Sequence, residues 1–574
     1  MADTRTVLEA RLQAAFDVVA PGADPVLRTS ERADYQANGA LALSKRLGLP
    51  PGQVAARVVA AADLSDLCEQ VEVSGPGFIN LTLSASYLAD QVAALSADRR
   101  LGVPPARCPE AVVVDYSAPN VAKEMHVGHL RGTIIGDALC RLLEFAGHRV
   151  IRRNHIGDWG TPFGMLIEHL VDIGEDTAVR ELAVGDLDAF YRQAWAAFEA
   201  DETFRERSRH RVVLLQSGDP ETLRLWRVLV DESIRYFDEV YAKLGVLLVD
   251  GDVVGESHYN PMLAAVVDDL AVKGLLVEDE GAQCVFPPGF TNRQGEPLPV
   301  IVRKSDGGFG YSATDLAAVR DRVDNLGADR ILYVVGTEQA QHFQMVFAVA
   351  AMAGWLPASV PAVHVSFAHI LGTDHKKLRS RTGASVKLVG LLEEAVERAA
   401  DAIAEREPGV AGDDLARASN ALGIGAVKYA DLSTERTRDY VFDWDRMLAF
   451  EGNTGPYLQY AHARVRSIFR RGEVDVPSGG SPPTLAAVEE RALALCLVGF
   501  SGAVAAALET YSPSKLTGYL FDLATTFTAF YERCPILRAP DAESRRSRLV
   551  LADLTGRTMA TGLGLLGIEA PEHM

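Results

Sequence analysis

The stretch AVVVDYSAPNVAKEMHVGHLRGTIIGDALCRLLEFAGHRVI, residues 111–151, decides the fold of this chain. It begins with a short apolar run, residues 111–116, whose β-branched residues are typical of a strand buried on both faces of a parallel sheet. A polar loop with a proline follows, and apolar residues then recur at helical spacing from 129 to 146, before Gly147. Val150 and Ile151 start another strand. The stretch therefore predicts a β-loop-α-β unit.

The same alternation returns later in the chain. Sheet-like segments at 300–303, 330–335 and 363–367 are separated by helical patterns at 314–325 and 339–353. Together with residues 111–151 they predict a Rossmann-type doubly wound parallel sheet. Between these parts, residues 165–295 are mostly charged amphipathic helices, such as 187–209 and 221–244, with short strands near 246–254. We interpret this segment as an insertion into the sheet domain.

Two further domains flank the sheet. The N-terminal part combines helical patterns at 3–20 and 34–49 with two strands in 71–83 around a Gly-Pro-Gly turn. From residue 387 almost every segment is helical in pattern, apart from a loop rich in Pro, Gly and Ser at 474–483. We therefore expect an α/β multidomain protein with an α+β domain at 1–108, the Rossmann domain at 109–386 with its insertion at about 165–295, and an all-α domain at 387–574.

Composition excludes several classes. With 574 residues, 48% hydrophobic and 23% charged, the chain is that of a folded protein of several domains. Its net charge of -20 argues against non-specific DNA coating but allows a local basic track. Six scattered cysteines without a CxxC pair give no support for a zinc ribbon or a disulfide framework, so we expect no structural metal. We see no signal peptide and no apolar run of ~20 residues, and expect a cytoplasmic protein without a membrane partner.

The segment His126-Val127-Gly128-His129 carries the first chemical signal. It follows the buried strand and opens a helix, which is where an α/β sheet binds its ligand. The glycine lets a nucleotide approach the backbone, and two imidazoles can donate hydrogen bonds to phosphate oxygens as charge builds at phosphorus, without a metal. As a bare pattern the pair also fits two surface or core histidines, but its position after a buried strand favours phosphate chemistry.

Residues 114–166 resemble the nucleotide-binding half of class I aminoacyl-tRNA synthetases, and among them the arginyl-tRNA synthetases. The motifs that carry the resemblance are Ser117-Ala118-Pro119-Asn120, the histidine pair and NHIGDWG at 154–160. GPGFIN at 75–80 is similar to the end of that family's N-terminal additional domain. The segments 450–457 and 460–464 resemble the start of its anticodon-binding helices, and 566–574 resembles its C-terminus. The resemblance therefore spans nearly the whole chain.

The resemblance implies an activity and a set of partners. The activity is ATP-dependent ligation of L-arginine to tRNA(Arg) through an arginyl-adenylate, for protein synthesis. The partners are tRNA(Arg), L-arginine and ATP, with Mg²⁺ arriving on ATP and no DNA, and we expect a monomer. Two alternatives remain. A small nucleotidyltransferase can carry the same histidine pattern but leaves the insertion and the C-terminal helices unexplained. The other alternative is a synthetase-like RNA-binding or regulatory protein that has lost activity.

Arginine recognition can also be argued from the residues. A guanidinium is a planar fork of donors that suits a carboxylate and oriented acceptors. Tyr311 and Asp315 are four residues apart at the start of a predicted helix and share a face, although Asp315 also fits as an ordinary charge near a helix N-terminus. They match the family's side-chain pocket. The resemblance adds further arginine-binding residues, namely Ser117, Asn120, Asn154 and Gln339.

The ATP site follows mainly from the resemblance. Gly336 and Glu338 come after an apolar strand, where the class has a glycine and an acid that meet the ribose, although plain strand termination is an alternative. The class has a mobile Lys-Met-Ser-Lys-Ser loop, and this chain has KKLRSRTG at 376–383, with arginine in place of the second lysine. The catalytic cation is therefore either Arg379 or Lys123, three residues before the histidine pair. The expected catalytic residues are His126, His129, Lys123 and Arg379. The expected ATP-binding residues are His126, Gly128, His129, Gly336, Glu338, His369, Ile370, Leu371, Lys377 and Arg379.

A basic segment of the last third suggests an RNA contact. Four arginines between 464 and 471 have no acid among them and lie close to Tyr457 and Tyr460 in the sequence, so the aromatic rings could stack on unpaired anticodon bases. A solvated helix face explains the arginines almost as well. With two residues added by resemblance, the expected tRNA-binding set is Tyr460, Arg464, Tyr531 and Met574.

Overall fold

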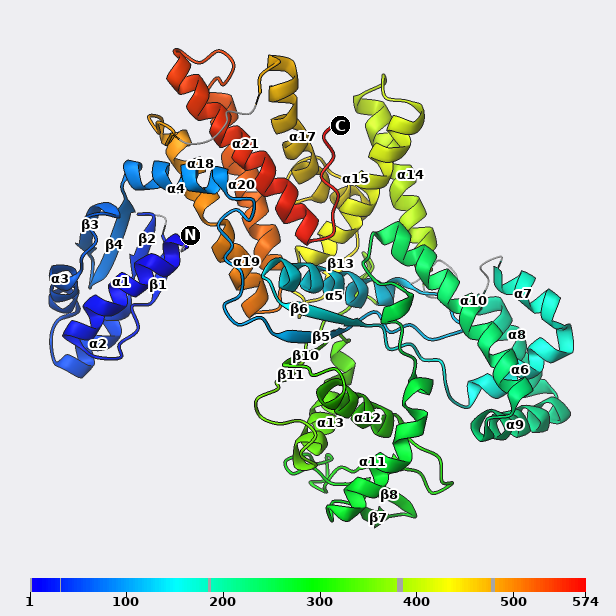
Figure 1. Cartoon of the computed structure of the whole chain (residues 1–574). Coiled ribbons are helices and arrows are strands. Elements are labelled where there is room, and N and C mark those ends of the chain that lie inside the picture. Colours follow the sequence, from blue (N-terminus) through cyan, green and yellow to red (C-terminus); the bar gives the residue numbers. More distant parts are fainter. Residues whose placement is uncertain (1–2, 31, 184–186, 379–385, 476–480, 574) are drawn as a thin grey trace. The chain divides into compact units, whose positions relative to one another are not determined.

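The computed structural model describes residues 3–30, 32–183, 187–378, 386–475 and 481–573 (Figure 1). The chain forms two compact units. One comprises Ala106–Leu448 and Leu565–Ile568, and the other comprises Met1–Pro105, Ala449–Gly564 and Glu569–Met574. Residues 387–448 thus belong to the unit that contains the parallel sheet, while the three-domain division at 108 and 386 stays a prediction.

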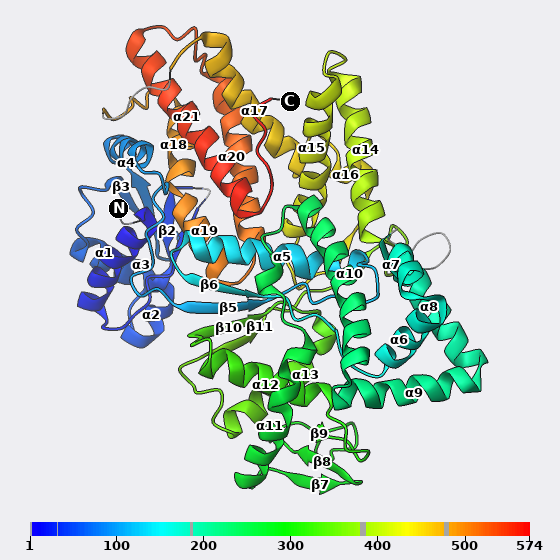
Figure 2. The same cartoon turned by 45° about the vertical axis from the view of Figure 1, so that its right-hand side comes forward.

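A four-stranded parallel sheet lies at the centre of the first unit and confirms the doubly wound pattern. Its order is β11 (Ala362–His364), β10 (Arg330–Tyr333), β5 (Ala111–Asp115), β6 (Arg149–Arg153). All five residues of β5 are buried. Helix α5 (Val127–Phe145) covers one face, and α12 (Tyr311–Asp324) and α13 (Ala340–Met352) cover the other (Figure 2). β6, the next strand in the sequence, lies on one side of β5, and β10 lies on the other side. Because the chain changes direction across the sheet at this point, a crevice opens between the loops that follow β5 and β10.

The insertion is helical, as expected. Its helices are α6 (Pro162–Ile173), α7 (Glu175–Ala183), α8 (Leu187–Ala200), α9 (Glu202–Ser217) and α10 (Pro220–Leu244). The single helix expected at 187–209 is wrong, because the Asp201 side chain accepts the backbone N–H of Thr203 and starts a new helix there. The strands expected near 246–254 are also wrong. That segment holds a short 3₁₀-helix, Asp250–Asp252, and one bridge between Asn154 and Val253.

The strand expected at 300–303 forms, but not in the parallel sheet. β9 (Val300–Arg303) pairs instead with β8 (Ala282–Val285), which pairs with β7 (Val277–Asp279), in an antiparallel sheet. Buried and exposed residues alternate along β9, whereas a strand inside a parallel sheet is covered on both faces. A 3₁₀-helix, Glu256–Tyr259, and α11 (Asn260–Val272) precede this sheet.

The rest of this unit is formed by the sequence beyond residue 365, and it supports the parallel sheet. It contains α14 (Leu388–Arg406), α15 (Gly412–Leu432) and α16 (Trp444–Met447). β12 (Ile370–Leu371) pairs in parallel with β13 (Tyr440–Val441), so the region expected to be wholly helical contains one short strand. Buried Arg131 of α5 forms an ion pair with Asp431 of α15 (3.2 Å) and donates to the carbonyl oxygen of Ala368 (2.9 Å).

The second unit joins the two ends of the sequence. Its N-terminal part is an antiparallel sheet in the order β1 (Leu27–Thr29), β2 (Tyr35–Ala37), β4 (Phe78–Leu83), β3 (Cys68–Ser74), with helices α1 (Thr4–Val19), α2 (Gly39–Leu47), α3 (Pro51–Ala61) and α4 (Ala85–Ala97). The hairpin expected at 71–83 is confirmed. The helix expected at 34–49 begins only at Gly39, because residues 35–37 form β2.

The C-terminal part of this unit is helical. It consists of α17 (Gly455–Gly472), α18 (Val488–Val498), α19 (Phe500–Glu509), α20 (Ser514–Arg533) and α21 (Ala542–Leu565). Residues 488–509 are the one described stretch long and apolar enough to cross a membrane, and 44% of its apolar window is buried inside the protein. Core helices of soluble proteins meet the same criterion. Arg491 of α18 pairs with Asp34 through two hydrogen bonds (3.0 and 2.6 Å), which joins the helical part to the N-terminal sheet.

Candidate active site

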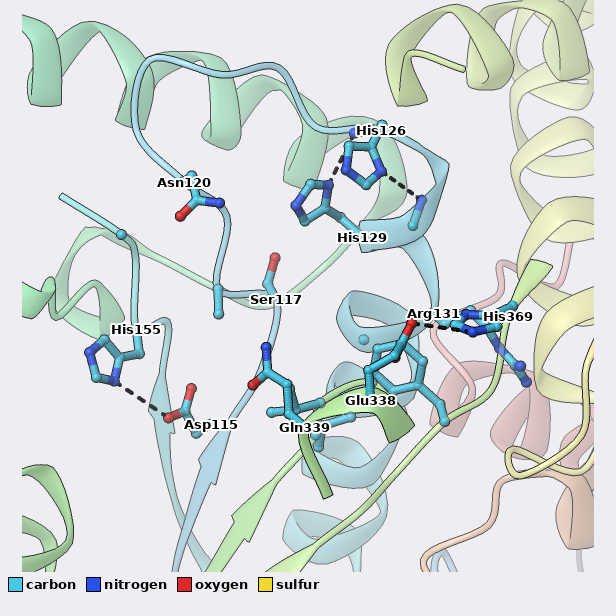
Figure 3. A pocket seen from close by; sticks show the side chains of 18 of the residues that line it. Asp115, Ser117, Asn120, His126, His129, Arg131, His155, Glu338, Gln339 and His369 are labelled. Carbon is cyan, nitrogen blue, oxygen red and sulfur yellow. Dashed lines mark hydrogen bonds and ion pairs between the residues drawn. The ribbon is translucent and has the colours of Figure 1, made fainter. Parts of the chain in front are cut away.

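A cavity of about 760 Å³ lies at the crevice between β5 and β10 (Figure 3). Many residues expected from the sequence line it together: Ser117, Asn120, His126, Gly128, His129, Tyr311, Asp315, Gly336, Glu338, Gln339, His369, Ile370 and Lys377. They come from segments up to 260 residues apart. Asn154, Leu371 and Lys123 are not among the lining residues. Arg379 and Met574 lie outside the described residues.

The two histidines form one wall of the cavity at the start of α5. Nδ1 of His126 accepts the backbone N–H of Gly128 (3.0 Å), and Nδ1 of His129 accepts the backbone N–H of His126 (3.1 Å). Their ring centroids lie 4.1 Å apart. A Cβ on Gly128 would come within 2.7 Å of the His126 ring, so only glycine leaves this ring in place. Because each Nδ1 is an acceptor, each neutral imidazole carries its proton on Nε2.

Burial keeps both histidines neutral. It lowers the pKa of His126, and it lowers the pKa of His129 to about 4, with the neighbouring His126 adding to the shift. Near neutral pH the wall therefore offers two N–H donors without a net charge. Such donors can stabilise an oxyanion that gains charge during a reaction.

The loop between β5 and α5 is strained. Ser117, Ala118 and Ala122 all have positive φ angles (74°, 48° and 57°), a conformation that residues with a Cβ rarely adopt. Asn154, fully buried at the end of β6, holds this loop, because its Oδ1 accepts the backbone N–H of Ala118 (3.0 Å). Its Nδ2 donates to the hydroxyl of Tyr241 (3.0 Å). The geometry thus places Asn154 behind the cavity wall, with both ends of its amide engaged.

One end of the cavity is acidic. Tyr311 and Asp315 of α12 both reach it, as their spacing predicts, and Asp115 and Glu256 join them. Nε2 of His342 on α13 lies 2.6 Å from Asp315 Oδ2, and this hydrogen bond raises the pKa of His342. Burial, together with nearby Asp158 and Asp315, raises the pKa of Glu256 to about 7. A cationic, planar group is the ligand that such a set of carboxylates suits.

Asp115 was missed by sequence reasoning and forms the floor of this acidic end. Its Oδ2 accepts a hydrogen bond from Nη2 of Arg322 (2.6 Å), and both side chains are buried. His155 approaches the same oxygen, with Nδ1 at 3.9 Å (Figure 3). Its position at the carboxyl end of the first strand could have identified Asp115 from the sequence, because ligands bind at that end of parallel strands. The sequence gives no such indication for Glu256 and Arg322, because only the tertiary structure brings these two residues to the acidic end.

The other end of the cavity is formed by Glu338, His369 and Lys377. Glu338 Oε1 lies 3.2 Å from Nε2 of His369 and 3.3 Å from Nζ of Lys377 (Figure 3). A Cβ on Gly336 would lie 2.7 Å from Glu338 Oε2, so glycine leaves room for this carboxylate. The backbone of 370–378 folds back on itself, since Leu371 bridges Lys377. The cavity is thus acidic at one end and carries a lysine and a histidine at the other.

Lys123 contacts a residue that does not line the cavity. Its Nζ lies 4.6 Å from the centre of the Tyr191 ring on α8. The neighbouring Glu124 instead accepts a hydrogen bond from Nζ of Lys387 (2.8 Å), just after the segment 379–385. The choice between Lys123 and Arg379 as the catalytic cation stays a prediction.

Three of the four expected RNA contacts lie together in the second unit. The guanidinium of Arg464 lies 4.9 Å from the ring centre of Tyr460 on α17 and 5.8 Å from that of Tyr531 on α20. The latter ring is 39% exposed. Arg470 donates to the backbone carbonyl of Glu572, so this arginine of the basic segment is tied to the chain's last residues.

Among the described residues, no group of three or more His, Cys, Asp or Glu side chains is arranged to hold a metal ion. The cavity's carboxylates are spread over both ends instead.

Models of known protein families match nearly the whole chain. Residues 91–444 match "tRNA synthetases class I (R), catalytic domain", 458–574 match "DALR anticodon binding domain", and 3–83 match "Arginyl tRNA synthetase N terminal domain". These three matches agree with the expected fold class of an α+β N-terminal domain, a parallel-sheet catalytic domain and a helical anticodon-binding domain.

Full-length relatives agree with the family models. The arginine–tRNA ligase of Thermobifida fusca is 55% identical over 100% of both chains, and that of Escherichia coli is 49% identical over 96% of both. Among solved structures, arginyl-tRNA synthetase from Plasmodium falciparum has a TM-score of 0.86 at 30% identity, and that from Thermus thermophilus has 0.81 at 26%. Each covers 100% of both chains.

Proposed function

The chain belongs to the class I arginyl-tRNA synthetases, and on this premise we propose how its cavity divides the work of the reaction. Its activity is arginine–tRNA ligation: L-arginine reacts with ATP to give arginyl-adenylate and pyrophosphate, and the arginyl group passes to the 3′-terminal ribose of tRNA(Arg). The arginine carboxylate is the nucleophile, so no protein nucleophile is required. Catalysis then consists of positioning and charge stabilisation.

His126 and His129 stabilise the charge that develops at the α-phosphate. The observation that carries this proposal is the pair of Nδ1 acceptors, because it leaves each neutral ring with an Nε2–H donor and no metal is needed for that task. The start of helix α5 at the same place adds the favourable dipole of a helix N-terminus.

Arginine lies with its guanidinium at the acidic end. Asp315 and Glu256 accept the planar fork, and the ring of Tyr311, whose side chain is 77% exposed, covers it. Asn120, Ser117 and Gln339 line the middle of the cavity and hold the amino and carboxylate groups. Asn154 contributes indirectly, because its amide fixes the loop and not the substrate.

ATP lies toward the end with Glu338 and Lys377. Gly336 and Glu338 meet the ribose, the 369–371 backbone meets the base, and Lys377 with the loop that follows meets the pyrophosphate. Lys377 now pairs with Glu338 (3.3 Å), so a phosphate must draw the lysine away as ATP binds. Mg²⁺ arriving with ATP would supply charge neutralisation at the leaving pyrophosphate.

The second unit binds tRNA. The stacked set of Tyr460, Arg464 and Tyr531 presents a cation and two aromatic faces, which suits unpaired anticodon bases. Met574, which lies outside the described residues, is a tRNA-binding residue by family resemblance alone. The protein acts as a monomer in the cytoplasm.

The test is attachment of labelled arginine to tRNA, with ATP–pyrophosphate exchange run in parallel. Exchange is measured without RNA, with intact tRNA, and with tRNA whose 3′ adenosine is oxidised. We expect attachment of arginine and exchange that both tRNAs stimulate, because binding of RNA favours a closed active site. Equal exchange without RNA would contradict the coupling, and absence of attachment would contradict the function.

A further inference from the structure

Helix α10 of the insertion lies against the strained loop between β5 and α5, and two of its buried hydroxyls reach that loop. Ser233 is fully buried and Tyr241 is 2% exposed. Eight residues apart, they lie two turns from each other along the helix. Neither residue lines the cavity or belongs to the residues assigned above to the substrates.

Ser233 holds the second strained position. Its Oγ donates to the carbonyl of Leu229 in its own helix (2.8 Å) and accepts the backbone N–H of Ala122 (3.0 Å). Ala122 has a φ of 57°. The serine proton is therefore used within α10, and a lone pair remains to fix a backbone group in a left-handed conformation.

Tyr241 holds the first strained position, partly through Asn154. Its hydroxyl accepts from Nδ2 of Asn154 (3.0 Å) and is hydrogen-bonded to Ser117 Oγ (2.8 Å). Asn154 Oδ1 in turn accepts the N–H of Ala118. Ser117 and Ala118 have φ angles of 74° and 48°. One hydroxyl thus reaches both left-handed residues, directly and through one amide.

These contacts matter because of what the loop carries. Ser117 and Asn120 face the cavity, and the loop ends at His126 (Figure 3). Strained backbone persists only where surrounding groups determine it, and such strain is concentrated at functional sites. On the proposed function, we infer that α10 positions the arginine-binding and phosphate-binding groups, with Tyr241 and Ser233 as positioning residues for the ligation reaction.

The experiment compares Tyr241→Phe and Ser233→Ala with the parent in tRNA arginylation, with rates normalised to folded enzyme by active-site titration. We expect kcat to fall on the order of 10-fold to 100-fold and the arginine KM to rise several-fold, because small misplacements of reacting groups have effects of this size. A loss of folded protein alone would change neither normalised value. The matched controls are Tyr519→Phe and Ser208→Ala, whose buried hydroxyls have no hydrogen-bond partner among the described residues.

A rescue separates positioning from general damage. Glycine adopts positive φ angles without strain. We therefore expect Ala118→Gly in the Tyr241→Phe background, and Ala122→Gly in the Ser233→Ala background, to raise kcat/KM at least threefold above the value of the corresponding single variant. Values within twofold of the parent for both single variants would overturn the inference, and so would losses that neither glycine reduces. Arginylation by the parent is established first, so failure of the proposed function is recognised separately.

Discussion

At the scale of single residues, the negative charge of Asp315 contributes to the specificity for arginine. Its carboxylate is paired with His342, at 2.6 Å. The substrate's guanidinium must replace that contact, and it offers a bidentate geometry that an ammonium cannot match. A site with fixed acceptors for a planar fork also leaves those acceptors unpaired when lysine enters, which allows discrimination of ~10⁴ by binding alone.

We therefore predict that Asp315→Asn raises the KM for arginine about 100-fold and leaves the KM for ATP within twofold. Steady-state arginylation measures both constants. Asp324→Asn on the last turn of the same helix is the control, since that carboxylate is exposed and distant from the cavity. If the parent activated lysine within tenfold of arginine, the assignment of this pocket would be wrong.

Glu256 gives arginine binding a pH dependence. Because burial raises its pKa to about 7, the carboxyl is largely protonated at pH 6 and ionised at pH 8. The KM for arginine should fall about tenfold over this range, since one ionisation with that pKa controls the attraction. Protonation of His342 below its raised pKa acts in the same direction. Glu256→Gln should flatten the profile, and an unchanged slope in this variant would exclude Glu256 as its source.

The same group affects stability with a known sign. The folded pKa of Glu256 lies above its unfolded value of about 4.3, so its contribution favours folding at low pH and is lost as the pH rises through 7. Bound arginine reverses this, because it favours the ionised form. Thermal shift by arginine should thus be larger at pH 8 than at pH 6.

At the scale of elements, α5 and β5 owe their contact to one glycine. A Cβ on Gly136 would lie 2.3 Å from Cβ of Tyr116, so α5 rests directly on the strand's end. We predict that Gly136→Ala destabilises the protein by about 3 kcal/mol and reduces activity, because the helix that carries the histidine pair must shift. Denaturant unfolding measures the loss.

Gly518→Ala in the second turn of α20 is the matched control. Nothing lies within 4 Å of its added Cβ, so higher helix propensity should leave stability equal or raise it by about 0.5–1 kcal/mol. Equal effects of the two substitutions would mean that the close approach of α5 and β5 has no energetic weight.

Elements with a strong periodic pattern could be predicted from the sequence. The β5-α5-β6 unit, β10 and the histidine pair followed from apolar runs and from one motif. β9 was placed in the wrong sheet, because four residues show that a strand forms but not which strand it pairs with. The helix at 187–209 was too long, because the cap formed by Asp201 outweighs the continuous helical pattern. Glu256, Arg322 and Tyr241 could not be predicted, since only tertiary packing brings Glu256 to the cavity, Arg322 to Asp115 and Tyr241 to Ser117.

At the scale of the whole molecule, the two ends of the sequence fold together into one unit. The contact between Asp34 and Arg491 is bidentate, and Asp34 is only 7% exposed. Arg491 also donates to the carbonyl of Leu83 (2.8 Å). No pattern in either segment predicts that these two residues, more than 400 positions apart in the sequence, form an ion pair. The pairing depends on which surfaces meet after each domain has folded.

Arg491→Ala should therefore loosen the N-terminal sheet. We expect a loss of about 3 kcal/mol in local stability, seen as faster hydrogen exchange in β1–β4, since a buried carboxylate loses its cation. Arg533→Ala removes the ion pair of an exposed arginine with Glu489 on a neighbouring helix and should leave these exchange rates close to those of the parent. Equal exchange rates in the parent and Arg491→Ala would show that this contact does not hold the sheet.

The central claim is that two neutral histidines promote adenylate formation in the cavity. The most direct measurement is arginine-dependent ATP–pyrophosphate exchange, with tRNA present, by His126→Ala, His129→Ala and the exposed control His210→Ala. The account predicts a loss on the order of 10²-fold or more for each of the first two, with arginine binding nearly unchanged, and parental exchange for the third. Exchange at the parental rate in both His126→Ala and His129→Ala would contradict it.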